Sequence, residues 1–393
     1  MRNQTFGEWF FLPNNITWNE LRETVGESYP EFGVYWQWSI FFGAVLYIFR
    51  DYILIPFILK PLGLRAGVRS RPYPAPPPNK TLEDLYAVNR ARPPRQLLTA
   101  AASRINWSER AVERWLRQKA LSGQMTTLEK FCDMGWQATF YGCFFIAGLF
   151  IMLPQEFVWE PSKALTNFPF EQTQAVIWWY CVIDTGFYIT QSYVLFTLDR
   201  RHDFYIMLSH HIITLSLACL NLTMNNLKQQ ALAVFLHEVA DIPLSVGKML
   251  RYVGRNADIL GYVFALIWIA TRLVAFPLMI LVPSFTETSG KSWPAKFLTQ
   301  GSTSILLILH ILWTFEIVNA YSRKLNNNMD LSDGRSSPEE LSGDSENEKM
   351  NHGGKISNGI IKNGTSGSGY FSNGITQRTV WKDISVDKAR LRN

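Results

Sequence analysis

Residues 209–241, "SHHIITLSLACLNLTMNNLKQQALAVFLHEVAD", hold two apolar runs separated by a short polar turn. Runs of this kind are typical of membrane-spanning helices, and two of them joined by a short turn predict an antiparallel helical hairpin. Ionisable groups inside a bilayer cost roughly 3 kcal/mol each, so they usually line a functional cavity. The ionisable residues that raise this possibility here are His210, His211, His237, Glu238 and Asp241.

The rest of the 393-residue chain also has the composition of a polytopic membrane protein. The sequence "RDYILIPFILKP" after the first apolar segment either extends that helix or lies at the membrane interface. We expect an all-α polytopic membrane protein in which about seven transmembrane helices enclose an intramembrane catalytic cavity that faces the cytosol. The seven apolar segments are 33–49, 131–153, 175–198, 204–222, 229–250, 259–282 and 301–321.

The distribution of positive charge predicts the orientation of the chain. Arg and Lys gather after the first, third, fifth and seventh segments, whereas the other connections carry few of them. The positive-inside rule therefore places the carboxyl terminus in the cytosol and the amino terminus in the lumen. Asn3 and Asn15 lie in lumenal glycosylation sequons. Asn79 and Asn106 lie in sequons on the cytosolic side, so we expect them to stay unmodified.

The parts between and beyond these segments define the expected regions. The tail is rich in Ser, Gly, Asn and charge and has no periodicity, which predicts disorder. In this tail Ser337, Ser342 and Ser345 precede acidic residues, a context that acid-directed kinases favour. The regions are a lumenal amino-terminal segment (1–32), the first transmembrane helix with its interfacial extension (33–60), a proline-rich linker (61–78), a cytosolic helical region (79–125), six further transmembrane helices (126–323) and a disordered cytosolic tail (324–393).

The hairpin brings together groups suited to acid–base or acyl-transfer chemistry. Residues equally far from its turn lie at the same depth, which places His210 level with Asp241. His237 and Asp241 are four residues apart on one helix face, and Glu238 flanks that face. An imidazole held by a carboxylate is a general base, and a desolvated imidazole can also accept an acyl group. Both roles are compatible with the sequence.

Metal binding is the main alternative for the same side chains. The sequence "HEVAD" lacks the second histidine of the H-E-x-x-H zinc motif. Di-iron lipid hydroxylases need many histidines, and this chain has six. His202, His310 and His352 are too scattered along the sequence to complete such a site. We therefore expect no metal ion.

A site inside the membrane that opens to the cytosol suits a lipid substrate and a water-soluble, activated one. The phosphates of a carrier such as coenzyme A would need basic contacts near the cytosolic helix ends. The same basic residues also serve as topology signals, so either role explains them. The candidates are Arg200, Arg201, Lys248, Arg251 and Arg255.

Residues 199–254, from "DRRHDFYIMLSHHIITL" to "HEVADIPLSVGKMLRYVG", resemble the signature segment of the ceramide synthases, the TLC-domain acyltransferases of the endoplasmic reticulum. The family pattern has paired histidines followed by His-Asp-x-x-Asp on the next helix. His210 and His211 match the pair, and His237 and Asp241 match the outer positions of the second element. Glu238 replaces the first aspartate and is longer by one methylene.

The resemblance extends over about residues 10–340. "LPNNITWNEL" is similar to the lumenal amino terminus of the family, "SERAVERWLRQK" to its partial homeobox-like domain at 79–125, and "DGRSSPEE" to its acidic tail motif. The resemblance implies transfer of a fatty acyl group from acyl-CoA to a sphingoid base, giving dihydroceramide or ceramide. It implies no cofactor besides this co-substrate, contact with membrane lipids, and homo- or heterodimers with other ceramide synthases. In the family the loop at 283–293 influences acyl-chain length.

Within this resemblance, His210 is the preferred nucleophile or base, and His211 is the alternative. A non-catalytic TLC-domain protein, either lipid-binding or translocon-associated, is the alternative function, although a passive binder has no need of the paired histidines. A membrane-anchored DNA-binding regulator is a further alternative. Homeodomains read adenine with an asparagine three residues after a tryptophan, and Gln118 follows Trp115 here, so we do not expect DNA as a partner.

Overall fold

The computed structural model of the chain describes residues 4–26, 31–91, 93–122, 124–197, 204–288 and 293–327. All of these belong to one compact unit, Met1–Glu346, and a second unit, Asn347–Asn393, lies outside them. Every regular element in the described ranges is a helix, which confirms the all-α class. The expected sites that fall outside the described residues are Asn3, Arg200, Arg201, Ser337, Ser342 and Ser345.

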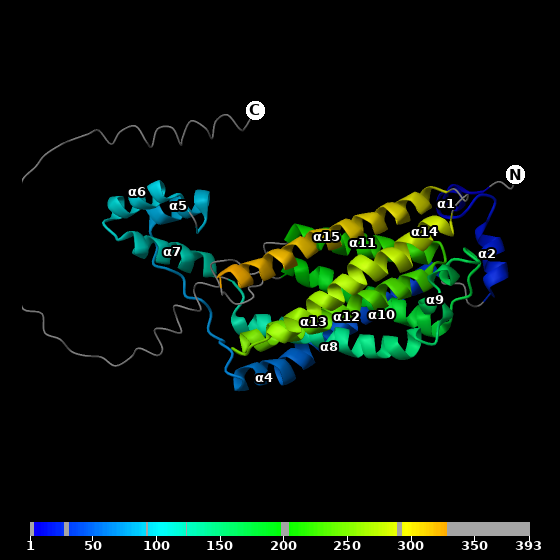
Figure 1. The fold of residues 1–393 in the computed structure, drawn as a ribbon, viewed down its shortest axis with the longest axis horizontal. Helices are drawn as coiled ribbons and strands as arrows, with labels where there is room; N and C mark the ends of the chain where they lie inside the picture. The colour runs from blue at the N-terminus through cyan, green and yellow to red at the C-terminus, as the bar shows by residue number, and fades with distance from the viewer. Residues whose placement is uncertain are drawn as a thin grey trace, which may run out of the picture. The chain divides into compact units, whose positions relative to one another are not determined.

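Within the described residues, seven long helical stretches coincide with the seven apolar segments (Figure 1). Five of these stretches are long and apolar enough to cross a membrane, and α10 and α12 are outside that set. The membrane character of the chain is thus supported, while the number of spans stays a prediction. The stretches are α3–η2–α4 (Phe32–Ile48, Phe49–Leu59 and Lys60–Arg65), α8 (Thr127–Met152), α10 (Ala175–Thr197), α11 (Phe204–Thr223), α12 (Leu227–Tyr252), α13–η4–η5–α14 (Asp258–Trp268, Ile269–Ala275, Pro277–Leu281 and Val282–Thr286) and α15 (Pro294–Asn327).

The first stretch is one continuous helix, so "RDYILIPFILKP" extends it. Its middle part, η2, is a π-helix that contains Pro56. Proline lacks an N–H and its ring clashes with the carbonyl one α-helical turn back, and wider turns relieve this conflict. The wider spacing is visible where the Lys60 N–H donates to the Ile55 carbonyl, five residues earlier.

Region 79–125 forms three short helices with an apolar cluster of their own. They are α5 (Lys80–Asn89), α6 (Arg95–Ile105) and α7 (Glu109–Leu121), and their cluster includes Leu82, Leu98 and Leu116. On α7, the Trp115 indole donates to the Pro77 carbonyl at 2.7 Å and the Gln118 amide donates to the Pro74 carbonyl at 3.1 Å. Gln118, at the position of a homeodomain's base-reading asparagine, therefore binds the proline-rich linker.

The predicted turn between the hairpin helices is confirmed at residues 224–226. Asn225 adopts a left-handed conformation there (φ 57°). Its amide donates to the carbonyls of Pro169 and Glu171, and the Glu171 carboxylate pairs with Lys228. The connection between α8 and α10, which includes α9 (Glu156–Trp159) and η3 (Pro161–Ala164), thereby fixes the end of the hairpin.

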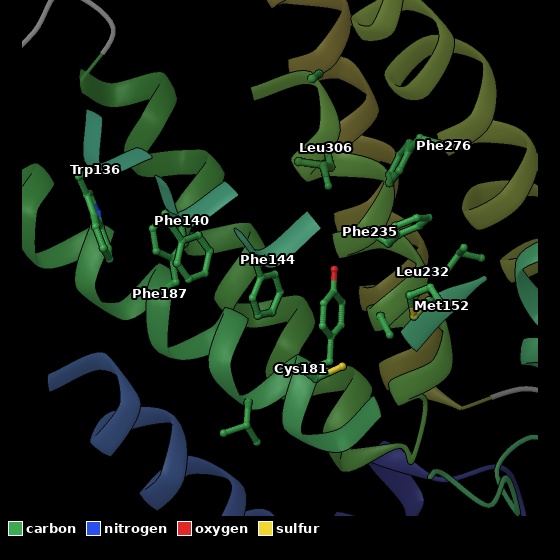
Figure 2. Packing of buried hydrophobic residues seen from close by; sticks show 14 of the residues in the cluster. Trp136, Phe140, Phe144, Met152, Cys181, Phe187, Leu232, Phe235, Phe276 and Leu306 are labelled. Atoms are coloured by element: carbon green, nitrogen blue, oxygen red, sulfur yellow. The ribbon is translucent and has the colours of Figure 1, made fainter. Parts of the chain in front are cut away.

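Aromatic rings fill the core between α8 and α10. Figure 2 shows Trp136, Phe140 and Phe144 in a row along α8, with Phe187 of α10 against Phe140. The Phe140 and Phe187 rings stack with centroids 3.6 Å apart, and Phe144 stacks on Tyr180 at 4.3 Å. The rings in both stacks are nearly parallel, with interplanar angles of 2° and 11°, and this close contact fixes their orientation. The stack thus aims the Tyr180 hydroxyl toward α12.

Small residues let α3 approach α10 until their backbones touch. A Cβ atom on Gly186 would lie 2.7 Å from the Ser39 carbonyl oxygen, and one on Gly43 would lie 3.0 Å from the Gly186 oxygen. The Thr190 hydroxyl spans the same crossing and donates to the Gly43 carbonyl at 2.8 Å. Such small-residue contacts are a common way for membrane helices to associate.

We expect Gly186→Ala to lower the free energy of unfolding by about 1–3 kcal/mol, because the added methyl group would clash with backbone rather than with a movable side chain. The measurement is thermal unfolding of the detergent-purified protein. Gly142→Ala on α8 is the matched control, since a Cβ there meets nothing within 4 Å and alanine favours the helix. Equal stability of the two variants would contradict the close packing.

Candidate functional site

A cavity lies among α10, α11, α12, η5 and α15. The cavity has a volume of about 70 Å³, and its wall is mostly apolar. His210 and His237, two of the expected site residues, are both part of the wall. The remaining lining residues are Asp184, Thr185, Tyr188, Thr214, Leu215, Leu217, Ala218, Asn221, Gln229, Gln230, Ala233, Val234, Phe276, Ile280, Thr299, Thr303 and Leu306.

The cavity is elongated along the helices. On α11 its lining residues run from His210 to Asn221, roughly 16 Å at 1.5 Å per residue. A smaller pocket shares Gln229 and Thr299 with it and continues to Trp293, beyond the end of α14. The histidines therefore lie toward one end, and the other end approaches the connection between α14 and α15. This shape suits a chain-like ligand that lies lengthwise.

The paired histidines have different surroundings. His210 borders the cavity, and its ring centroid is 5.3 Å from that of Trp313. His211 is buried and is not part of the cavity wall. Its Nδ1 is 3.2 Å from the Ser192 hydroxyl, which itself donates to the Tyr188 carbonyl. Because a carbonyl only accepts, His211 Nδ1 must donate to Ser192, and in the neutral ring Nε2 carries no hydrogen.

His237 contacts His310 of α15, a histidine that lies far from it in the sequence. Their Nε2 atoms are 3.1 Å apart, and His310 is fully buried. His237 Nδ1 is 2.6 Å from the Ala233 carbonyl and must donate to it. When both rings are neutral, His237 Nε2 accepts a hydrogen from His310 Nε2. These two residues are 73 positions apart in the sequence, and the packing of α15 in the bundle brings them together.

Asp241 forms an ion pair with Arg272 of η4, at an N–O distance of 3.1 Å. The same guanidinium nitrogen donates to the His237 carbonyl at 2.5 Å, and the guanidinium lies 5.1 Å from the centre of the Trp268 ring. Arg272 is only 4% exposed, so its charge needs a partner. Arg272 was not among the residues expected from the sequence, although "IATRLVAF" places it in an apolar run.

Two more carboxylates are buried near this centre. Glu238 is 3% exposed and accepts a hydrogen bond from the Tyr180 hydroxyl at 3.0 Å. Asp184 of α10 is equally buried and is part of the cavity wall. Asp184 was also not expected from the sequence, although it too lies in an apolar run, "WYCVIDTGFY". The structure thus adds Asp184, Arg272 and His310 to the five expected residues.

The basic candidates that are described lie at the carboxyl end of α12. Arg251 is 3.8 Å from the Asp258 carboxylate, which Lys324 also approaches at 2.5 Å. Lys248 is half-buried and Arg255 is exposed. Arg251 is thus partly neutralised within the protein, and Arg255 is accessible to an anionic ligand.

Two further expectations concern modification and metals. Asn15 is exposed, as glycosylation requires, whereas the Asn79 side chain caps α5 by accepting from the Leu82 N–H. In the part of the chain that the structure describes, no group of three or more His, Cys, Asp or Glu side chains could hold a metal ion. Glycosylation and the absence of a metal stay predictions.

Comparisons with known proteins identify a matching family model and several similar proteins. The TLC domain family model matches residues 130–319, which include all the histidines described above. Ceramide synthase 5 of Homo sapiens is 30% identical over 345 residues, covering 85% of this chain and 87% of the relative. Ceramide synthase 5 of Mus musculus is 29% identical over 342 residues, covering 85% and 81%. Ceramide synthase 4 of Mus musculus is 26% identical over 359 residues, covering 90% and 91%.

We expect Arg272→Gln to lower the free energy of unfolding by about 3 kcal/mol or more, because it removes the buried cation that pairs with the Asp241 carboxylate. In the double variant with Asp241→Asn the loss should be smaller than the sum of the two single losses. Thermal unfolding in detergent measures all three, with the exposed Arg255→Gln as a control that should cost little. Strictly additive losses would show that the ion pair contributes no coupling.

Proposed function

The chain belongs to the ceramide synthase family, and from this premise we propose that it is an acyl-CoA-dependent N-acyltransferase of sphingoid bases. It transfers a fatty acyl group from the thioester to the amine of sphinganine or sphingosine and releases free coenzyme A. The observation that carries the proposal is the elongated, mostly apolar cavity with His210 and His237 in its wall. Its apolar wall can accommodate a long hydrocarbon chain, and its histidines place an imidazole near the reacting groups.

We assign the reacting imidazole to His210 and keep His211 as the alternative. His210 borders the cavity, whereas His211 is not part of its wall and donates to Ser192. The carboxylate of Asp241 neutralises Arg272, and Arg272 in turn holds the His237 backbone. Asp241 is therefore a positioning residue. We give His237 and Glu238 supporting roles in proton transfer.

Two routes lead to the amide. In the covalent route, an unprotonated ring nitrogen attacks the thioester carbon and the thiolate leaves, after which the amine attacks the acyl-imidazole and frees the ring. In the direct route, the amine attacks the thioester while the imidazole removes its proton. In both, the proton lost by the amine ends on the thiolate, so one amine and one thioester give one amide and one thiol.

The cavity gives each substrate a place in this reaction. The acyl chain lies along the apolar wall, with its methyl end toward the pocket at Trp293. That pocket includes Ser284 and Thr288, which lie in or beside the loop that influences acyl-chain length in the family. The phosphates of coenzyme A bind at the carboxyl end of α12, where Arg255 is exposed. We place the protein in the endoplasmic reticulum membrane with its amino terminus in the lumen.

The proposed activity predicts a product and two loss-of-function variants. Membranes that contain the protein, incubated with sphinganine and a panel of acyl-CoAs, should form N-acyl product, and added EDTA should not reduce it. His210→Ala should lower the rate about 100-fold or more, since it removes the acid–base group. Asp241→Ala should also lower it strongly, because it leaves the Arg272 charge unpaired.

Glu160→Ala is the control for this assay, because its side chain is 67% exposed and is not part of the cavity wall. It should keep the parent rate. Normal product from His210→Ala and Asp241→Ala would refute the site assignment. An absence of N-acyl product from the parent protein with every acyl-CoA would refute the proposed activity.

The covalent route predicts an acylated protein. Incubation with a labelled acyl-CoA in the absence of a sphingoid base, followed by rapid denaturation, should leave label on the peptide that contains His210. The label should be missing from His210→Ala and should disappear from the parent when sphinganine is added before denaturation. Normal product formation with no trapped label would favour the direct route.

A further inference from the structure

The cavity wall contains hydrogen-bond acceptors without a partner. Among the described residues, the Asp184 carboxylate has no hydrogen-bond or ion-pair partner. The same holds for the Gln230 Oε1 atom and the Thr214 hydroxyl, which lie in the walls formed by α12 and α11. Three helices thus each place an unsatisfied polar group on the cavity. Buried polar groups are nearly always hydrogen-bonded, so this set calls for an explanation.

A hydrogen bond to α3 fixes the orientation of the Gln230 amide. Its nitrogen donates to the Tyr35 hydroxyl of α3 at 3.2 Å, and that hydroxyl is 2.8 Å from the Thr185 hydroxyl. Gln230 is 6% exposed and Tyr35 is fully buried. With the nitrogen engaged in this network, the carbonyl oxygen Oε1 is the unsatisfied atom. Gln230 therefore offers the cavity an acceptor.

Thr214 differs from most hydroxyl residues in the long helices. Thr139, Thr271 and Thr314 each donate to the carbonyl four residues back, which satisfies the hydroxyl inside its own helix. Thr214 makes no such bond. Its hydroxyl is left to accept from or donate to a molecule in the cavity.

Of the three unsatisfied groups, the Asp184 carboxylate costs the most free energy to bury. It is 3% exposed, and a carboxylate in an apolar interior is tolerated only with a partner of opposite charge or with hydrogen-bond donors. A ligand that satisfies all three groups must donate several hydrogen bonds and carry positive charge. A 2-amino-1,3-diol has an ammonium group and two hydroxyls, which matches this requirement.

We propose that Asp184 binds the ammonium group of the sphingoid base, and that Gln230 and Thr214 bind its hydroxyls; the proposal rests on the function given above. His210 and His237 share the cavity wall with these residues. Binding the headgroup here places it in the same cavity as the imidazoles and leaves the hydrocarbon chain in the apolar part of the cavity. Before acyl transfer the bound ammonium gives one proton to the Asp184 carboxylate, which leaves the neutral amine that attacks. Asp184 is a substrate-binding residue in this arrangement.

The test compares two unreactive analogues that differ in charge. N,N-dimethylsphinganine is cationic, and the matching long-chain 1,2,3-triol carries a neutral hydroxyl in place of the amine. The detergent-purified parent protein should bind the cationic analogue about tenfold or more tightly than the triol. In Asp184→Asn, which keeps the shape of the side chain, this preference should shrink to about twofold. An unchanged preference would overturn the proposal.

Asp133→Asn is the matched control, because Asp133 is also 3% exposed but pairs with Arg50 and is not part of the cavity wall. It should keep the preference for the cationic analogue. If Asp184→Asn does not fold, Thr214→Val carries the test. The Thr214→Val variant should bind N,N-dimethylsphinganine at least threefold more weakly than the parent does. It should bind the 1,3-dideoxy analogue, which lacks both hydroxyls, as tightly as the parent does. Equal effects on both analogues would overturn the proposal.

Analogue binding needs no turnover, so it separates the two proposals. One possible result is that the parent prefers the cationic analogue, that Asp184→Asn does not, and that no acyl-CoA gives product. This result would refute the enzymatic function and support the headgroup site. If the parent acylates sphinganine and Asp184→Asn keeps both the charge preference and the parent KM for sphinganine, then the headgroup site alone is refuted.

Discussion

The guanidinium of Arg272 is the interaction on which the arrangement of the site depends. A charge at this depth is retained only with partners, and here they are the Asp241 carboxylate and the His237 carbonyl. Both partners are on α12, so the contact fixes the rotation of that helix against η4. The same rotation turns His237 toward His310 and places Gln230 and Ala233 on the cavity wall. Local charge pairing thus determines which α12 side chains can meet a ligand.

Hydrophobic periodicity and charge were sufficient to predict much of the fold. Each apolar segment became a long helix, and the turn of the hairpin lies where the polar residues indicated. Three site residues were missed: Asp184, Arg272 and His310. Each is an ionisable group in an apolar run, the same signal that marks the hairpin, so single residues of this kind can indicate a site as well as a dense motif can.

Other features depend on packing that no local pattern encodes. Neighbouring residues on a helix point about 100° apart, and sequence alone does not say that His210 borders the cavity while His211 does not. The partner of Asp241 lies on a helix that follows later in the chain, and α12 packs mainly along α8 rather than along its hairpin neighbour α11. These choices follow from how side chains of several helices fit together.

The contact of α3 with α10 also limits how hydrophobic molecules reach the interior. At Gly43 and Gly186 the two backbones leave no room even for a methyl group. A hydrocarbon tail from the surrounding bilayer cannot slip between these two helices at that level. Lateral exchange of lipids with the interior must therefore pass through a different seam of the bundle, and the α3–α10 crossing acts as a closed wall.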